Sequence, residues 1–454
     1  METKLERKYG LITAVAMVVG IVIGSGVFFK AEKVLKATGG NLTLGILAWV
    51  IGGIIMIACA YTFAIMATKY QYLNGVVDYA EAAMGEKYGY YVGWFMALIY
   101  YPTLTSVLAW VSARYTCVLF GFPITGGECM TIACLYLIGS YALNALSPVL
   151  AGKFQVSTTI IKLIPLILMA VVGTIVGIRS GMTINNFTTV VTKVSTSNAL
   201  FTAVVATAFA YEGWIIATSI NAELKDAKRN LPLALVAGTF TVMTVYILYY
   251  IGLAGAVTNK VMMAGGEAGA KLAFQTVFST VGGSLIFVFV IISCLGTLNG
   301  LMLGCTRGLY SVAARGFGPK PNVFNQVDSV TNMPTNSSTF GLLLCGIWLL
   351  FFYGANLTKS WFGFFSFDSS ELPIITIYAL YIPIFFMMMR KERDLSFFNR
   401  FVMPIVSLAG CFFMIIAACF SHKMEVVAYL IVFAIIMGIG VIFAHKEVDR
   451  SLNF

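Results

Sequence analysis

Charged residues are scarce in this chain of 454 residues, and histidine is almost absent. Only 11% of the residues are Asp, Glu, Lys or Arg, and there are two histidines, His422 and His445. The sequence contains no phosphate-binding loop, zinc motif or nucleophile elbow, which excludes ATP-driven pumping by this chain and the common hydrolytic chemistries. We therefore predict that the chain is not an enzyme and uses no cofactor and no metal.

Cysteines are scattered without the paired spacing of a metal site or a disulfide framework. Most of the nine lie singly inside apolar runs, as Cys59, Cys134 and Cys345 do. Such cysteines are expected to pack rather than react. Only Cys129, beside the segment GFPITGGEC, lies near a predicted outer loop.

Apolar residues fill most of the remaining sequence. They make up 59% of the chain, and the mean hydropathy is +0.89. A helix needs roughly 20 apolar residues to cross the hydrocarbon core of about 30 Å. The sequence predicts an all-α polytopic membrane protein, with residues 1–454 forming one transmembrane domain. Twelve spans are predicted, near residues 10–29, 41–67, 89–118, 130–148, 156–177, 198–218, 232–257, 274–305, 337–354, 363–389, 401–420 and 425–444.

The net charge of +10 is spread over the short loops between these spans, which argues against nucleic acid as a partner. With the N-terminus in the cytoplasm, the inner loops carry the excess of Lys and Arg. This distribution predicts a multi-pass protein of the cell membrane with both termini cytoplasmic. One outer segment departs from the rule: KAEKVLKATGG carries Lys30, Lys33 and Lys36. Their spacing of three predicts a short surface helix with its charges in water.

Two of the predicted spans are interrupted by small or polar residues. The first, VVGIVIGSGVFFK, is broken at Gly24, Ser25 and Gly26, and the sixth is broken at AYEG, residues 210–213. Each break lies in the first span of a set of five, and two such sets have opposite orientation. Matched breaks of this kind predict inverted repeats, here near 10–178 and 198–390, followed by additional helices 401–420 and 425–444. The alternative is that these glycines only allow close helix packing.

An unwound turn within the membrane needs partners for its backbone groups. The small residues 24–26 would let a ligand approach bare amides, and the half-helix N-terminus there favours an anion such as a carboxylate. The break in the sixth span offers free carbonyls, which suit an ammonium group. Together the two breaks suit an α-amino acid.

Two ionisable side chains fall well inside apolar runs. Lys162 lies about 9 Å along its helix from Val156, and an intramembrane lysine usually faces a cavity or a partner, with snorkelling to the surface as the alternative. Glu212 could bind freed amides, bind a proton, face a water-filled vestibule or satisfy only its local backbone. In contrast, DSSELP, residues 368–373, is typical of a helix start, and ELKDAKRNLP, residues 223–232, of an inner loop leading into the seventh span.

Several segments together resemble a known family. GIVIGSGVFF, KLIPL, FAYEGW and SCLGTLNGLMLGCTRGLYSVAARG, in this order over nearly the whole chain, resemble the amino acid-polyamine-organocation superfamily, specifically its L-type amino acid transporter family. The chain is similar to the bacterial alanine-serine-cysteine and serine-threonine exchangers. The resemblance implies the fold of the sodium-coupled leucine transporter, a five-plus-five inverted repeat with broken helices 1 and 6 and two additional helices.

The resemblance also implies roles for individual residues. It assigns the substrate carboxylate to the backbone amides of Ser25, Gly26 and Val27, and the substrate ammonium to the carbonyls of Ile23, Phe209 and Ala210. Lys162 matches a family lysine that takes the place of a sodium ion and touches the unwound part of span 1.

Further implied roles concern the rim of the site. Phe209 resembles the aromatic that closes the site from outside, and Tyr246 matches a tyrosine near the substrate. Glu212 stays a candidate substrate-binding residue, although the family often has Asp or Gly there and its role does not carry over. Because Cys129 does not match the cysteine that links the animal members to a heavy chain, we expect no such disulfide-linked partner.

We therefore expect a sodium-independent exchanger of small neutral L-amino acids such as alanine, serine or cysteine, which works by alternating access. One alternative is a proton-coupled or cationic amino acid transporter, in which Glu212 titrates or pairs with a basic substrate. Another, from a different class, is an amino acid receptor or channel.

Overall fold

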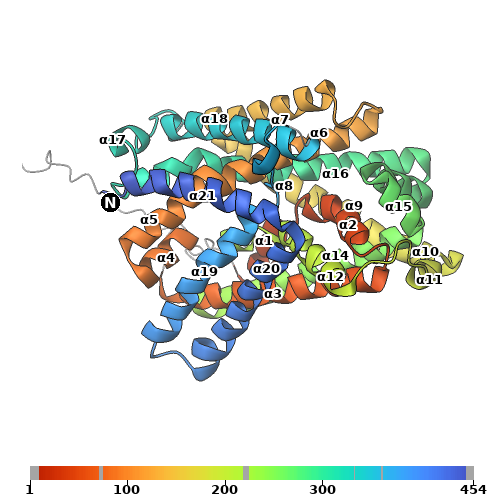
Figure 1. Cartoon of the computed structure of the whole chain (residues 1–454), viewed down its shortest axis with the longest axis horizontal. Coiled ribbons are helices and arrows are strands. Elements are labelled where there is room, and N and C mark those ends of the chain that lie inside the picture. Colours follow the sequence, from red (N-terminus) through yellow and green to blue (C-terminus); the bar gives the residue numbers. More distant parts are fainter. Residues whose placement is uncertain (1–9, 71–74, 218–223, 332, 359–360, 446–454) are drawn as a thin grey trace, which may run out of the picture.

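The computed structural model describes residues 10–70, 75–217, 224–331, 333–358 and 361–445. The two ends of the chain, residues 1–9 and 446–454, lie outside the described residues. So do Thr218, at the end of the sixth predicted span, and Glu223 of the predicted loop 223–232. Within these ranges the chain forms helices and no β-strand. The helices are gathered in one bundle, in which the long helix α16 runs along much of the molecule (Figure 1).

Ten helices or helix runs of the described chain are long and apolar enough to cross a membrane. They correspond to all the predicted spans except the first and the sixth, and they support a polytopic membrane protein. In chain order they are α3 (Leu42–Lys69); α5 (Glu86–Phe95), η1 (Met96–Tyr100) and α6 (Tyr101–Phe120); α7 (Gly127–Leu146); α8 (Pro148–Ile161), α9 (Leu163–Leu168), η2 (Met169–Gly173) and α10 (Thr174–Ser180); α14 (Ala227–Ala256); α16 (Glu267–Ala313); α18 (Thr335–Phe352) and η4 (Tyr353–Leu357); α19 (Leu372–Lys391); η6 (Phe398–Val402) and α20 (Met403–His422); and α21 (Met424–Ile442).

Shorter helices connect these runs. They are α4 (Val76–Met84), α11 (Met182–Thr188), α15 (Asn259–Gly265), α17 (Pro321–Phe324) and the 3-10 turn η5 (Gly363–Phe365).

The first and sixth predicted spans are each divided in two. The first consists of α1 (Leu11–Val22) and α2 (Gly26–Ala37), and the sixth of α12 (Thr196–Tyr211) and α13 (Trp214–Ala217). The breaks lie where the sequence predicts them. Because α2 packs against α12 and α1 against α13, the second half of each broken span meets the first half of the other. The two broken spans are therefore antiparallel and adjacent.

Two span boundaries differ from the prediction. Helix α16 extends well past the predicted range 274–305 at both ends, with non-helical backbone at Phe278 and Ser279. The tenth predicted span begins late, because α19 starts at Leu372. Pro373 lies in its first turn, so the prediction that DSSELP begins a helix is confirmed.

The predicted surface helix at residues 30–40 is wrong. Residues 26–37 form α2, the second half of the first span, and the Lys30 side chain is completely buried. The sequence spacing alone suggested charges in water, but a carboxylate from a distant helix pairs with Lys30 inside the protein. Only Lys36, which is half exposed and pairs with Glu32 one turn earlier on α2, resembles the expected arrangement.

A proline shapes the third predicted span beside the centre of the bundle. Pro102 in the first turn of α6 has no N–H group, and the residues just before it form the π-helical turn η1. The carbonyl of Leu98, four residues before the proline, accepts a hydrogen bond of 2.9 Å from the indole Nε1 of Trp348 on α18. The indole of Trp348 thus supplies the hydrogen-bond donor that Pro102 lacks.

This contact gives a test of the local fold. We expect Trp348→Phe to lower the free energy of unfolding by about 1–3 kcal/mol, the cost of leaving a buried carbonyl unsatisfied. In the background of Pro102→Ala, which restores a backbone N–H, the same change should cost clearly less. Thermal unfolding of the two single variants and the double variant in detergent measures this difference, and equal costs in both backgrounds would contradict the assignment.

Candidate functional site

The breaks of the two divided spans lie against each other. The first break runs from Ile23, in extended backbone with φ −66° and ψ 110°, to Ser25. The second is formed by Glu212, which is also extended, and by Gly213, whose φ of +107° favours glycine. A Cβ atom on Gly26 would lie 2.4 Å from the Cα of Ala210, so only glycine allows the two main chains to approach this closely.

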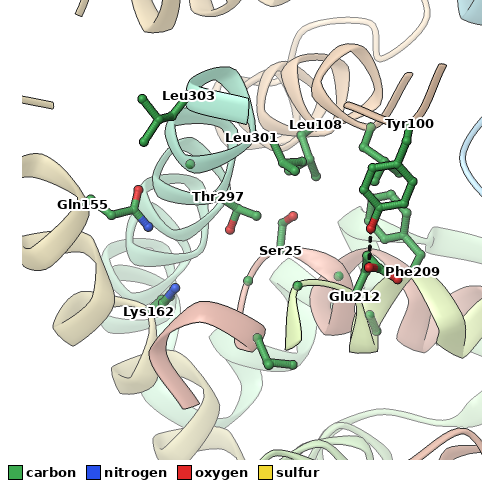
Figure 2. A pocket seen from close by; sticks show the side chains of 17 residues that line it. Ser25, Tyr100, Leu108, Gln155, Lys162, Phe209, Glu212, Thr297, Leu301 and Leu303 are labelled. Carbon is green, nitrogen blue, oxygen red and sulfur yellow. Dashed lines mark hydrogen bonds between the residues drawn. The ribbon is translucent and has the colours of Figure 1, made fainter. Parts of the chain in front are cut away.

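A cavity of about 240 Å³ lies beside these breaks. The two unwound segments form part of its wall, and α6, α8, α16 and η1 contribute further lining residues (Figure 2). Apolar side chains form part of this wall: Val22, Leu104, Leu108, Leu301 and Leu303. A pocket with apolar walls and a few convergent polar groups is typical of a small-molecule site.

Lys162 lies at one end of this cavity. Its side chain is 1% exposed, and its Nζ donates a hydrogen bond to the carbonyl of Gly20 in the last turns of α1. The helix is interrupted at Lys162, between α8 and α9, and Pro165 cannot donate to the carbonyl of Ile161. The lysine therefore places a cation against the helix that ends at the first break.

Glu212 lies at the other end of the cavity, away from Lys162 and Gln155 (Figure 2). Its carboxylate accepts a hydrogen bond from the hydroxyl of Tyr100. Tyr100 is the last residue of the π-helical turn η1, and such turns often occur at functional sites. The cavity thus has a positive end and an acidic end, with the unwound turn at Ser25 between them.

The structure brings together most of the residues that the sequence singles out. Ser25, Gly26, Lys162, Phe209, Ala210 and Glu212 line the cavity. Ile23 and Val27 are buried neighbours of this wall whose side chains do not line it. Tyr246 lies behind the breaks: its hydroxyl donates to the carbonyls of Val22, at 3.2 Å, and Ala210, at 3.1 Å. It therefore joins the two broken spans.

Sequence reasoning missed three polar lining residues: Tyr100, Gln155 and Thr297. Gln155 is hydrogen-bonded to two further amide side chains: Asn299 donates to the Gln155 side chain at 3.2 Å, and Asn144 donates to the Asn299 side chain at 2.9 Å. These residues come from three different helices. Amides inside apolar runs are a usable sequence signal, since they need partners in the membrane.

Aromatic rings and a buried ion pair cover the cavity on the α2 side. Phe209 packs edge-on against Phe29, with ring centroids 5.8 Å apart, and the Nζ of Lys30 lies 5.0 Å from the Phe209 ring. The same Nζ pairs with Glu371 at 2.5 Å and donates to the Ser370 hydroxyl at 3.2 Å. The ring predicted to close the site is thus held beneath an ion pair between α2 and the start of α19.

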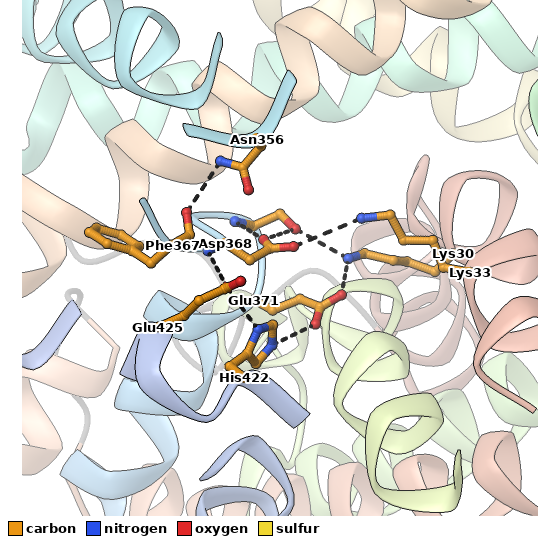
Figure 3. Close-up of polar contacts among 9 residues, drawn as sticks. Lys30, Lys33, Asn356, Phe367, Asp368, Glu371, His422 and Glu425 are labelled. Atoms are coloured by element: carbon orange, nitrogen blue, oxygen red, sulfur yellow. Dashed lines mark hydrogen bonds and ion pairs between the residues drawn. The ribbon is translucent and has the colours of Figure 1, made fainter. Parts of the chain in front are cut away.

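Further charges surround this pair (Figure 3). Lys33 lies 4.0 Å from Asp368, and His422 at the end of α20 contacts Glu371 at 3.1 Å and Glu425 at 3.4 Å. The cluster therefore connects α2, α19, α20 and α21 above Phe209.

A second cavity, of about 210 Å³, lies on the α13 side of the first cavity, opposite to the α2 side. The two share Gly300 and Leu303 on α16, and the second is also lined by Arg307, which follows Gly300 by about two helical turns. The predicted span ended at residue 305, so sequence reasoning treated Arg307 as a loop residue. No group of three or more His, Cys, Asp or Glu within the described ranges could hold a metal ion.

The buried pair of Lys30 and Glu371 yields a stability prediction. In Glu371→Gln the ammonium of Lys30 keeps its burial but loses its carboxylate, and we expect a loss of about 3–5 kcal/mol in the free energy of unfolding. The double variant Lys30→Met/Glu371→Leu should recover most of this loss, because a buried ion pair is often replaced by apolar side chains at little cost.

Lys36→Gln is the matched control. It removes a cation of the same helix whose side chain is 50% exposed, so the loss should stay below about 1 kcal/mol. Thermal unfolding in detergent compares the variants. A Glu371→Gln protein as stable as Lys36→Gln would show that the ion pair contributes nothing to the fold.

Comparisons with known proteins show the family of the chain. Residues 9–442 match the family model described as amino acid permease. The chain is 30% identical over 428 residues to the serine/threonine exchanger SteT of Bacillus subtilis (strain 168), an alignment that covers 93% of each chain. It is 24% identical to the b(0,+)-type amino acid transporter 1 of Mus musculus, over 95% of this chain and 86% of the relative. It is also 27% identical to the mouse Asc-type amino acid transporter 1, over 75% of this chain and 63% of the relative.

The matching model spans nearly the whole chain, and these relatives are amino acid transporters and exchangers rather than enzymes. The chain therefore belongs to the amino acid permease family of the amino acid-polyamine-organocation superfamily, and it is an amino acid transporter of a membrane.

Proposed function

We propose that this chain is a sodium-independent exchanger of small neutral L-amino acids, such as alanine, serine or cysteine. The observation that carries the proposal is the meeting of two helix breaks at one cavity, with a buried lysine bonded to the first broken span. The unwound turn at 23–25 offers amides for a carboxylate, and the break after Tyr211 offers carbonyls for an ammonium. An α-amino acid needs both.

The charges around the cavity favour a neutral substrate side chain. Lys162 is hydrogen-bonded to the carbonyl of Gly20, and Glu212 to the hydroxyl of Tyr100. Both charged residues that line the cavity therefore have partners within the protein. The space between them is bordered by apolar side chains and by the small polar groups of Thr297 and Gln155. A short side chain, with or without a hydroxyl or thiol, suits these walls.

The lysine supports independence from sodium. In this proposal the Lys162 ammonium does the work of a bound cation, because it donates a hydrogen bond to the carbonyl of Gly20 near the first break. A fixed ammonium needs no ion gradient to be occupied. The transporter would then be driven by the amino acids that it exchanges.

The membrane arrangement in the proposal has twelve spans. The ten long runs and the two divided spans make up two inverted sets of five, residues 10–178 and 198–390, and two additional helices. The chain lies in the cell membrane with both termini in the cytoplasm and acts without a disulfide-linked heavy chain. The antiparallel contact of the two divided spans supports the inversion.

Alternating access would use the two sides of the cavity. On the α2 side, Phe209 and the ion pair of Lys30 and Glu371 close the path. On the other side, the second cavity adjoins the first through Gly300 and Leu303. In the proposed orientation the closed side is extracellular and the second cavity lies toward the cytoplasm.

Exchange can be tested with purified protein in liposomes. We expect labelled L-alanine to enter vesicles loaded with L-alanine in sodium-free buffer, and not to enter empty vesicles. Loading with each neutral, acidic and basic amino acid in turn defines the substrate class. Failure of every amino acid to support uptake would refute the proposal.

A second candidate function rests on Glu212, a carboxylate in the wall of the pocket. If this group carries a proton or pairs with a basic side chain, the chain is a proton-coupled or cationic amino acid transporter. Uptake by empty vesicles that grows with an inward proton gradient, or a preference for lysine or arginine, would favour this candidate.

Lys162 provides the sharpest mutational prediction. Lys162→Ala removes the hydrogen bond to Gly20, and bonds to charged groups contribute about 1.5–3 kcal/mol. We expect alanine exchange to slow by about tenfold or more at equal protein density, with membrane insertion retained. Lys162→Arg should rescue poorly, because a planar guanidinium does not match a compact ammonium.

The measurement is alanine exchange by the wild type and both variants, with and without sodium. A fold-specific control is thermal unfolding of each purified variant. Wild-type rates in Lys162→Ala would show that the lysine has no part in transport.

A further inference from the structure

Arg307 differs from the other cations of α16 and of the turn that follows this helix. Arg315, two turns further on, pairs with Asp78 and lies 3.2 Å from Glu81. Lys271, near the start of the helix, donates to the carbonyls of Val118 and Leu119. Arg307 has an exposed side chain in the second cavity, and in the part of the chain that the structure describes it forms no ion pair, hydrogen bond or ring contact.

The position of Arg307 is deep for an unpaired charge. It follows Gly300, which lines the first cavity, by about 10 Å along the helix axis. If the first cavity lies at the membrane midplane, Arg307 lies within the hydrocarbon half-thickness of about 15 Å. A charged side chain at such depth normally faces a partner or a water-filled space.

Among the described residues, the surroundings of Arg307 leave the guanidinium available to a ligand. Val76, Val77, Met96 and Ile215 contribute apolar wall to the same cavity. Because this cavity adjoins the first at Gly300 and Leu303, a solute leaving the first cavity on this side passes Arg307. A guanidinium binds a carboxylate through two parallel hydrogen bonds, a geometry that an ammonium cannot offer.

We infer that Arg307 forms a second carboxylate site, which binds the α-carboxylate of an amino acid between the first cavity and the surface on the side of α13. The inference rests on the proposed function and extends it. The amino acid is held first by the guanidinium and then transferred to the amides at the first break. Arg307 therefore acts on substrate that arrives from this side and has no role for substrate that arrives from the α2 side.

An oxyanion of another source has the same chemistry. A lipid phosphate at the membrane surface could also bind an arginine that extends outward from its helix. We assign the site to the amino acid because Arg307 lines a cavity that shares the wall residues Gly300 and Leu303 with the first one. The two sources are separated experimentally by changing the lipid and the substrate independently.

The test measures exchange from each side separately. Wild type, Arg307→Gln and Arg307→Lys are reconstituted in vesicles whose protein orientation is established, and the half-saturating L-alanine concentration is measured on each face. We expect Arg307→Gln to raise this concentration about tenfold or more on the side of the second cavity and to leave the α2 side unchanged, as the loss of a hydrogen bond to a charged group would. Arg307→Lys should have an intermediate effect.

Arg390→Gln is the matched control. Arg390 is an exposed arginine in the last turn of α19 and does not line the second cavity. Removing it eliminates one positive charge from the protein, so a general charge effect would appear in both variants. We expect exchange by Arg390→Gln to equal that of the wild type on both faces.

Four results would overturn the inference. They are unchanged kinetics in Arg307→Gln, an equal change on both faces, a Lys variant as impaired as the Gln variant, and an effect that disappears when the anionic lipids of the vesicles are replaced by phosphatidylcholine. The last result would assign Arg307 to lipid. Absence of alanine exchange in the wild type would instead refute the proposed function, so the two failures are distinct.

Discussion

A helix that is interrupted inside a membrane exposes backbone groups that lipid cannot satisfy, and the centre of this protein is organised around that constraint. Two interruptions face one another, and each is completed by groups from elsewhere in the chain. Lys162 donates to a carbonyl before the first break, and the Tyr246 hydroxyl bonds to carbonyls on both broken spans. The cavity lies where backbone groups of the two breaks face open space. A ligand with a carboxylate and an ammonium can form hydrogen bonds with these groups.

Buried charged side chains also need partners from elsewhere in the chain. Lys30 is enclosed within the protein but meets Glu371, and Glu212 meets Tyr100. These pairs join helices that are far apart in sequence, so each charge that would be costly alone becomes a connection between elements. The ion pair above Phe209 is an example, because it fixes the start of α19 over α2 and covers one side of the cavity.

Sequence reasoning located the two breaks because local composition determines them. Glycine and serine in an apolar run, and a glycine after Glu212, are visible without any tertiary information. The buried state of Lys30 could not be predicted in this way, since its partner lies 341 positions along the chain. The helical spacing of Lys30, Lys33 and Lys36 was correctly recognised, but spacing alone does not distinguish water from a buried carboxylate.

The candidate site likewise contains residues that the local sequence predicts and residues that only the packing of the bundle reveals. Six predicted residues line the cavity. Five of them lie at the two breaks, and Lys162 was predicted from its charge inside an apolar run. Tyr100 and Gln155 come from other spans, and the sequence alone does not show that they line the cavity. Tyr246 was placed near the substrate by resemblance, but its hydroxyl is directed at backbone carbonyls behind the cavity.

The contact at Gly26 has a mechanical consequence. A side chain between two helices can change its rotamer and absorb a small displacement, but here the main chains themselves meet, with a hypothetical Cβ on Gly26 only 2.4 Å from the Cα of Ala210. No layer of side chains lies between them to deform. Helices α2 and α12 therefore cannot move closer together at this point, and an inward displacement of one helix pushes directly on the main chain of the other.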